Sequence, residues 1–255
     1  MHKKTINPNR RFSIGGKITF ACLAATLLVS PAAAVLINNT EFSFVYDGSL
    51  IPTESTPAWT KNGTGTLTAS TTDGILSMAA SNTAYYSLND PSIWQAGEGA
   101  GTTIEFSMKV VQHNAGAIRS AMAFVFSTGS RAYIVNFTET TVFFGNTVTP
   151  SLSYAIDTKA DFNTYRLTLT PAGVVSLYIN NSATPVITDY GGQANTSDQI
   201  YFGSGAAQVG GTVLWDYIAF THTGAFAPIP EPGSVALVGG LVGFTVMLLR
   251  RKRNR

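Results

Sequence analysis

The chain has 255 residues, of which 45% are hydrophobic and only 12% charged, and its formal net charge is +2. Ten of its 16 Lys and Arg residues lie within the first 17 or the last six positions. Residues 35–229 hold six basic and 13 acidic residues, a net charge of −7. This excludes a nucleic-acid partner, because phosphate binding needs a basic face. The single cysteine, Cys22, excludes an intrachain disulfide.

Residues 1–34 have the layout of a secretory signal peptide. A basic region is followed by the apolar stretch Ile18 to Val29, and then by small residues that include Ala32 and Ala34. A signal peptidase requires such small residues, so we expect cleavage after Ala34 and a mature N-terminus at Val35. The pair Arg10-Arg11 leaves twin-arginine export open as an alternative to ordinary secretion.

The body of the chain, residues 35–227, is predicted to be a single all-β domain. No stretch of ten or more residues in it has helical periodicity, whereas short alternating runs of apolar and polar residues recur between turn residues. About a dozen such runs fit a jelly-roll β-sandwich of two packed antiparallel sheets.

Three groups of strands are the clearest. The run 102–111 alternates strictly, with Ile104 and its apolar partners on one face and Glu105 on the other. The runs 165–169 and 175–180 flank Thr170-Pro171-Ala172-Gly173, a sequence that suits a type I turn and predicts a hairpin. The run 213–220 is apolar on both faces apart from Asp216, which is typical of a central strand. Further strands are expected near 41–47, 64–70, 74–79, 84–88, 119–127, 131–138, 140–145, 185–189 and 200–204, and residues 221–228 are expected to form a short linker.

The hairpin carries a family resemblance. The segment 162–169 reads Phe-Asn-Thr-Tyr-Arg-Leu-Thr-Leu, and 175–181 reads Val-Ser-Leu-Tyr-Ile-Asn-Asn. Together with Trp215-Asp216-Tyr217-Ile218, these segments resemble the concanavalin A-like lectin/glucanase and laminin-G-like sandwiches. The resemblance implies a fold and does not by itself imply sugar binding.

A search for catalytic residues finds little. Glucanases of that resemblance carry a Glu-x-Asp-x-Glu strand of paired carboxylates, and this chain has none. Glu105 and Glu139 are isolated acids on predicted strands and are expected to face solvent. His113 and His222 are too far apart in the sequence to suggest a metal cluster. We therefore expect no enzymatic activity and no cofactor.

A calcium site remains an open alternative. Lectins of the resembled class suggest that one could lie near Asn89-Asp90 or near Asp198. Calcium needs oxygen ligands that converge from several loops, and a single sequence does not show such convergence.

Carbohydrate contact is the more substantial prediction, since sugar sites combine aromatic faces with a few planar polar groups. The candidate contacts are Trp94, Tyr178 and Asn180. For each aromatic candidate, packing in the core is the alternative to contact with a sugar. Tyr85 and Tyr86 are adjacent, so in a strand one of them must face away from the core. The remaining candidates are Trp59, Asn89 and Asn181.

The last residues form a short motif, an apolar helix and a basic end. Pro230-Glu231-Pro232 precedes the uncharged stretch 234–249, and five of residues 250–255 are Lys or Arg. Sixteen helical residues span roughly 24 Å, slightly less than a hydrocarbon core of about 30 Å. The basic end is expected to stay in the cytoplasm. A plain C-terminal membrane anchor is the simpler interpretation.

Residues 228–255 resemble the PEP-CTERM sorting signal of Gram-negative bacteria. The resemblance implies recognition of Pro230, Glu231 and Pro232 by an exosortase, removal of the tail, and a host that makes extracellular polysaccharide. We therefore expect an exported protein, held briefly in the inner membrane and then placed at the cell surface or in the extracellular matrix. Its predicted role is that of a non-catalytic, polysaccharide-associated module of a biofilm. A structural surface-coat protein without a specific ligand and a divergent glycan-cleaving enzyme are the alternatives.

Overall fold

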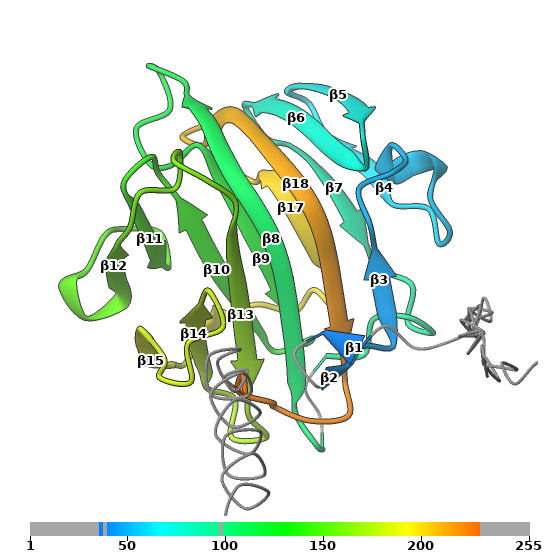
Figure 1. Cartoon of the computed structure of the whole chain (residues 1–255), viewed down its shortest axis with the longest axis vertical. Helices are drawn as coiled ribbons and strands as arrows, with labels where there is room; N and C mark the ends of the chain where they lie inside the picture. The colour runs from blue at the N-terminus through cyan, green and yellow to red at the C-terminus, as the bar shows by residue number, and fades with distance from the viewer. Residues whose placement is uncertain (1–35, 38–39, 97–98, 230–255) are drawn as a thin grey trace, which may run out of the picture. The chain divides into compact units, whose positions relative to one another are not determined.

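The computed structural model describes residues 36–37, 40–96 and 99–229 (Figure 1). The predicted signal peptide with its cleavage site, and the sorting signal from Pro230 onward, lie outside the described residues. Within the described part of the chain, no helix has the length and apolar character needed to cross a membrane.

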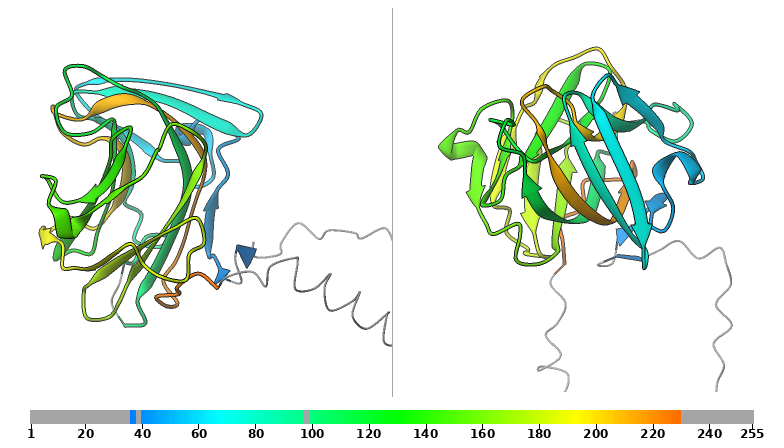
Figure 2. Two further views of the ribbon diagram at one scale, coloured as in Figure 1. Left: turned by 60° about the vertical axis from the view of Figure 1, so that its left-hand side comes forward. Right: turned by 90° about the horizontal axis from the view of Figure 1, so that it is seen from above.

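Two eight-stranded antiparallel sheets pack face to face (Figures 1 and 2). We call them the front sheet and the back sheet; the names do not follow the view of Figure 1, in which the back sheet lies nearer the viewer. The front sheet has the order β12 (Ser153–Ala155), β11 (Thr141–Phe144), β10 (Arg131–Phe137), β9 (Met122–Ser127), β17 (Ile200–Ser204), β7 (Ala84–Leu88) and β4 (Thr60–Gly63), with β16 (Gln193–Ala194) also on β10.

The back sheet has the order β15 (Ile187–Tyr190), β14 (Val175–Ile179), β13 (Asn163–Leu169), β8 (Thr102–His113), β18 (Gly210–Thr221), β6 (Ile75–Ser81) and β5 (Thr66–Thr72), with β3 (Phe44–Tyr46) also on β18. A small ribbon pairs β1 (Leu36–Ile37) with β2 (Thr40–Glu41), and two short 3-10 turns are η1 (Pro52–Glu54) and η2 (Pro150–Leu152). The predicted all-β sandwich of two antiparallel sheets is confirmed, and its arrangement is jelly-roll-like.

The predicted strands are largely present. The expected bounds 84–88 and 200–204 are those of β7 and β17, and the predicted hairpin is formed by β13 and β14. The described residues contain 18 strands rather than about a dozen. The additional strands β1, β4, β12 and β16 have two to four residues, which is too short for an alternating pattern to be visible.

The core lies between the sheets and is aromatic. Ile104 and its alternating partners Phe106, Met108 and Val110 on β8 are buried, as the pattern predicted. Phe106 of the back sheet stacks on Phe124 of the front sheet, with ring centroids 4.3 Å apart. Burying each such side chain contributes about 1.5–3 kcal/mol. The sheets are therefore held together along the middle of β8 and β9.

The central strand β18 contains a β-bulge. Its pairing with β8 shifts between Trp215 and Tyr217, so Asp216 is the extra residue. Trp215 and Ile218 both point into the core, while Tyr217 points outward. Beyond this bulge β18 pairs with β3 instead of β6. The bulge explains why the sequence appeared apolar on both faces.

Glu105 was expected to face solvent, and this expectation is wrong. The residue is fully buried on the outer face of the back sheet. Its Oε2 atom lies 2.6 Å from Nε of Arg166, and the hydroxyl of Tyr217 donates to its Oε1 atom over 2.7 Å. Arg166 in turn donates to Oγ1 of Thr40 over 2.9 Å and lies over the ring of Phe42. Residues at the beginning of the domain, Thr40 and Phe42, thus cover the Glu105–Arg166 pair.

The predicted linker 221–228 is also part of the fold. The hydroxyl of Thr103 donates to the carbonyl of Gly224, and the amide of Phe226 donates to the same hydroxyl, each over 2.7 Å. Pro228 is buried. This segment covers the outer face of the back sheet beside the Glu105–Arg166 pair, so the ordered domain extends past Ala227.

Candidate functional site

The outer face of the front sheet carries two adjacent tyrosines. Tyr85 on β7 and Tyr201 on β17 have ring centroids 4.6 Å apart at an interplanar angle of 38°. Their chain neighbours Tyr86 and Phe202 point into the core, so both tyrosines point outward. We call this surface the tyrosine face. It is defined by Tyr85, Tyr201, Ile134 and the loop residues described below, and Val125 is buried in the apolar cluster against which Ile134 and Tyr201 pack.

The pairing of the two tyrosines depends on a glycine. Gly203 lies opposite Tyr85 in the register of β17 and β7. A Cβ atom at position 203 would lie 2.6 Å from Cα and 2.7 Å from Cβ of Tyr85, and the φ angle of Gly203 is +142°. Only glycine therefore lets the Tyr85 side chain pass over position 203 toward Tyr201.

A row of planar polar side chains lies at one end of the tyrosine face. The Arg119 guanidinium donates from Nη2 to Gln208 over 2.6 Å and from Nη1 to Asn146 over 3.0 Å. Asn146 donates in turn to Gln193 over 3.0 Å. These residues belong to three loops and to β16, so the network ties four separate segments together. It holds the planar groups in defined positions.

Arg119 and Tyr85 both act electrostatically on Tyr201. The pKa of Tyr201 is raised to about 12, chiefly by burial and to a smaller extent by the neighbouring Tyr85, while Arg119 acts to lower it. The Tyr201 hydroxyl is therefore a neutral hydrogen-bond donor at neutral pH. Ala206 and Val209, on the same loop as Gln208, pack with Tyr201 in one apolar cluster.

A hollow of about 420 Å³ opens beside the network. Two apolar side chains border it, Ile118 with 82% of its surface exposed and Val148 with 60%. Its other lining residues are Arg119, Phe143, Asn146, Thr147 and Gln208. Apolar surface with a few placed polar groups is the usual composition of a small-molecule or sugar site.

Trp94 does not lie on this face. Its side chain is 1% exposed, and its Nε1 atom donates to the carbonyl of Ser127 over 3.0 Å. The ring packs edge-on against Phe126 and Phe220. The expected carbohydrate contact needs an open ring face, and Trp94 has none in this structure. Trp59 is buried in the core in the same way.

Tyr178 and Asn180 lie on the back sheet and its following turn. Tyr178 is half-buried opposite Arg166 in the register of β13 and β14. Asn180 has φ +52°; its Oδ1 atom accepts from the amide of Thr164 and its Nδ2 atom donates to Asn163. Asn180 therefore closes the end of the hairpin. The structure brings neither residue next to Trp94 or the tyrosine face.

The sequence contained a signal for Tyr201 that went unused. Tyr201 lies between the apolar residues Ile200 and Phe202. In a strand that points these two side chains into the core, the Tyr201 side chain must point outward. No such signal exists for Arg119, because its partners Asn146 and Gln208 are brought to it only by the fold.

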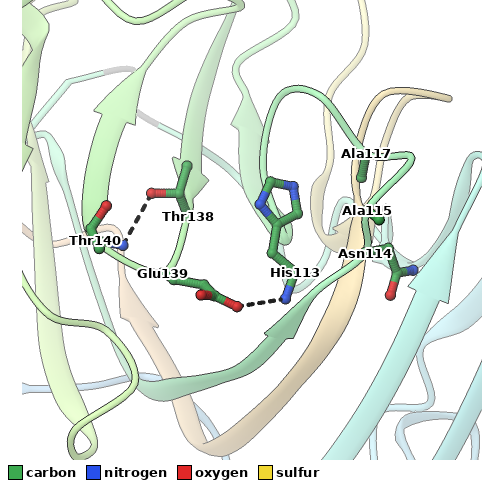
Figure 3. A pocket seen from close by; sticks show the side chains of 7 residues that line it. All are labelled: His113, Asn114, Ala115, Ala117, Thr138, Glu139 and Thr140. Atoms are coloured by element: carbon green, nitrogen blue, oxygen red, sulfur yellow. Dashed lines mark hydrogen bonds between the residues drawn. The ribbon is translucent and has the colours of Figure 1, made fainter.

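A second hollow, also of about 420 Å³, lies beside Glu139 (Figure 3). The Glu139 carboxylate, in the turn between β10 and β11, accepts from the amide of His113 over 3.2 Å and lies 3.2 Å from Nζ of Lys159. These two interactions, the first being the larger, lower the pKa of Glu139. Among the described residues that line this hollow, Glu139 is the only one with a carboxylate. Glycoside hydrolysis requires two, one of them protonated, so the hollow lacks that arrangement.

The described residues contain no group of three or more His, Cys, Asp or Glu side chains that could hold a metal ion. Asp90, one of the residues considered for calcium, accepts from the amide and hydroxyl of Ser92 and so closes a turn. His222 accepts from the amide of Gln95 at Nε2 and contacts Thr102 at Nδ1, each over 3.2 Å. Burial lowers the pKa of His222, which favours its neutral form.

Fold and site together describe a jelly-roll-like β-sandwich with two tyrosines on the outer face of one sheet. Over 76% of its length this chain is similar to all of a solved glycosidic hydrolase, with a TM-score of 0.50 and 14% identity. It is similar to the β-glucanase of Bacillus licheniformis over 70% of this chain and 97% of that one, with a TM-score of 0.49 and 14% identity.

The chain is also similar to the binding domain of botulinum neurotoxin serotype G, with a TM-score of 0.44 and 10% identity. That likeness covers 68% of this chain and only 45% of the neurotoxin domain. No protein-family model matches the sequence, and no curated protein is significantly similar to it. At such identities the solved structures show the fold alone.

Proposed function

We propose that this protein is a non-catalytic module that binds polysaccharide on the tyrosine face. The observation that carries the proposal is the Tyr85–Tyr201 ring pair beside the Arg119 network. The apolar C–H faces of sugar rings pack on aromatic rings, and their hydroxyls pair with planar amides and guanidinium groups. The network holds those groups in place before a ligand arrives, which reduces the entropy lost on binding.

The surroundings of the acidic residues support a non-catalytic role. Glu105 is buried and held by Arg166 and Tyr217, so it has no access to a glycosidic oxygen. Glu139 is paired with Lys159. A glycan-cleaving enzyme would release new reducing ends from the glycan, and the Glu105→Gln or Glu139→Gln variant would no longer release them. A surface-coat protein would fold normally and bind no glycan.

Removing the tyrosines should weaken binding selectively. We expect Tyr85→Ala and Tyr201→Ala each to lower affinity for the producing organism's exopolysaccharide by roughly tenfold, because each removes an aromatic contact. Affinity electrophoresis or calorimetry on the full chain, purified in a mild detergent, measures the change. Tyr178→Ala is the matched control on the back sheet and should bind normally. Loss of affinity in the control alone would move the site to the back sheet.

We propose further that the protein is exported and sorted by an exosortase. The support is the sequence of residues 1–34 and 228–255. On this proposal, the signal peptide and the C-terminal segment are both removed during export. The mature module would therefore reach the cell surface or the matrix, where polysaccharide is available to it.

Replacing Pro230-Glu231-Pro232 with three alanines should abolish tail removal. The expected product keeps its C-terminal apolar stretch and fractionates with the inner membrane, because a linear motif is what the sorting enzyme would recognise. Mass spectrometry of the C-terminal peptide and membrane fractionation provide the measurement. Ser234→Ala, just after the motif, is the control. Normal tail removal in the triple-alanine variant would show that the segment is a plain anchor.

A further inference from the structure

We infer that the polysaccharide taken by the tyrosine face is acidic, with a carboxylate or a similar anionic group that pairs with Arg119. This inference rests on the proposed glycan-binding function and names the class of its ligand. Its basis is the electrostatic environment of Arg119. This environment differs from that of Arg166 and Lys159, which are held in ion pairs elsewhere in the domain.

Arg119 has neutral partners only. The two ion pairs found among the described residues are Arg166–Glu105 and Lys159–Glu139, and neither includes it. Its hydrogen bonds go to the amide oxygens of Asn146 and Gln208. A guanidinium has five N–H donors, so two bonds leave several donors for a ligand. The positive charge of Arg119 is therefore positioned but not neutralised.

None of the described residues that line the hollow beside Arg119 is acidic. Its other lining residues are Ile118, Phe143, Asn146, Thr147, Val148 and Gln208. The hollows beside His113 and Tyr46, in contrast, are lined by Glu139 and Asp47 respectively. A body with a net charge of −7 thus presents an uncompensated cation in this hollow, and the same Arg119 acts electrostatically on Tyr201.

The same geometry favours a planar anion over a point charge. Asn146 and Gln208 hold the guanidinium from two sides, so its plane is fixed before binding. A fixed guanidinium plane suits two parallel N–H···O bonds to a carboxylate, which are stronger than neutral hydrogen bonds. A uronic acid unit would place its carboxylate on Arg119 while a neighbouring ring packs on Tyr201.

The test compares an acidic polymer with its neutral counterpart. Polygalacturonate and alginate are used as probes, each before and after chemical reduction of the carboxyl groups to alcohols, which leaves the sugar chain in place. The full chain in mild detergent should bind the acidic forms at least roughly tenfold more tightly, because charge-assisted hydrogen bonds are lost on reduction. This preference should fall as NaCl is raised toward 1 M, where the screening length is about 3 Å.

Arg119→Gln should remove the preference, so that the acidic and the reduced form of each polymer bind with the same affinity. Lys109→Gln is the control, since it removes the same charge from β8 of the back sheet, where Nζ donates to the carbonyl of Ala160. An unchanged thermal unfolding midpoint in both variants shows that folding is intact.

Equal affinity for acidic and reduced polymers, unaffected by Arg119→Gln, would overturn the inference and leave the proposed glycan binding standing. If the protein bound a neutral glycan but neither acidic probe, the inference would likewise be overturned and the proposed glycan binding would stand. Failure to bind any glycan would overturn both the inference and the proposed function.

Discussion

Glu105→Gln is expected to lower the free energy of unfolding by about 3–5 kcal/mol, the cost of leaving one partner of a buried ion pair without the other. Arg166 is 1% exposed, and its Nε atom lies 2.6 Å from the carboxylate that the substitution neutralises. The hydroxyl of Tyr217 would also lose its charged acceptor. Urea denaturation of the full chain, followed by tryptophan fluorescence, measures the change.

Two controls make this result specific. Glu105→Leu combined with Arg166→Met removes both charges and should recover most of the lost stability, because neither desolvation penalty remains. Lys159→Gln breaks the solvent-exposed pair with Glu139 and should have little measurable effect, because exposed pairs contribute little. A Glu105→Gln variant no less stable than Lys159→Gln would mean that water reaches the pair in solution.

The same substitution should loosen both ends of the domain. Arg166 donates to Thr40 and to the carbonyl of Phe226, which are remote in the sequence. Without Glu105 to orient the guanidinium, both contacts weaken. Limited proteolysis should then cut more readily near Phe226 in Glu105→Gln than in the double variant.

Trp94→Ala is expected to destabilise the domain by about 3–5 kcal/mol, as is usual for truncation of a buried aromatic side chain. The indole packs against Phe126, Phe220 and His222, and its N–H donates to the carbonyl of Ser127. Truncation leaves both a cavity and an unpaired carbonyl. The protein that remains folded should bind glycan with unchanged affinity, because no part of the ring reaches the surface.

Tyr201→Ala should show the reverse pattern, with a clear loss of affinity and a smaller loss of stability, since its ring is only partly buried on the outer face of the sheet. Parallel denaturation and binding curves for the two variants separate the roles. A Trp94→Phe variant that kept its stability but lost glycan affinity would restore the original expectation of a Trp94 contact.

Much of the architecture was predictable from local patterns. The alternation in 102–111 and the Pro-Ala-Gly turn between 165–169 and 175–180 act within a few residues, and both are present in the structure. The site was less predictable. The prediction of Trp94, Tyr178 and Asn180 rests on residue type, and residue type does not distinguish a buried ring from an exposed one. Tyr201 could have been found from its strand alone.

The sequence by itself determined the all-β class, the alternation that separates core from surface, and the prediction of export and sorting, because each depends on neighbouring residues or on a linear motif. Only the tertiary structure decided which outward-facing residues are covered. Glu105 and Lys109 share one face of β8, yet the first is buried and the second is accessible. The cover on the Glu105–Arg166 pair involves Thr40, 126 residues from Arg166. Contacts at such separations arise only when the whole chain folds.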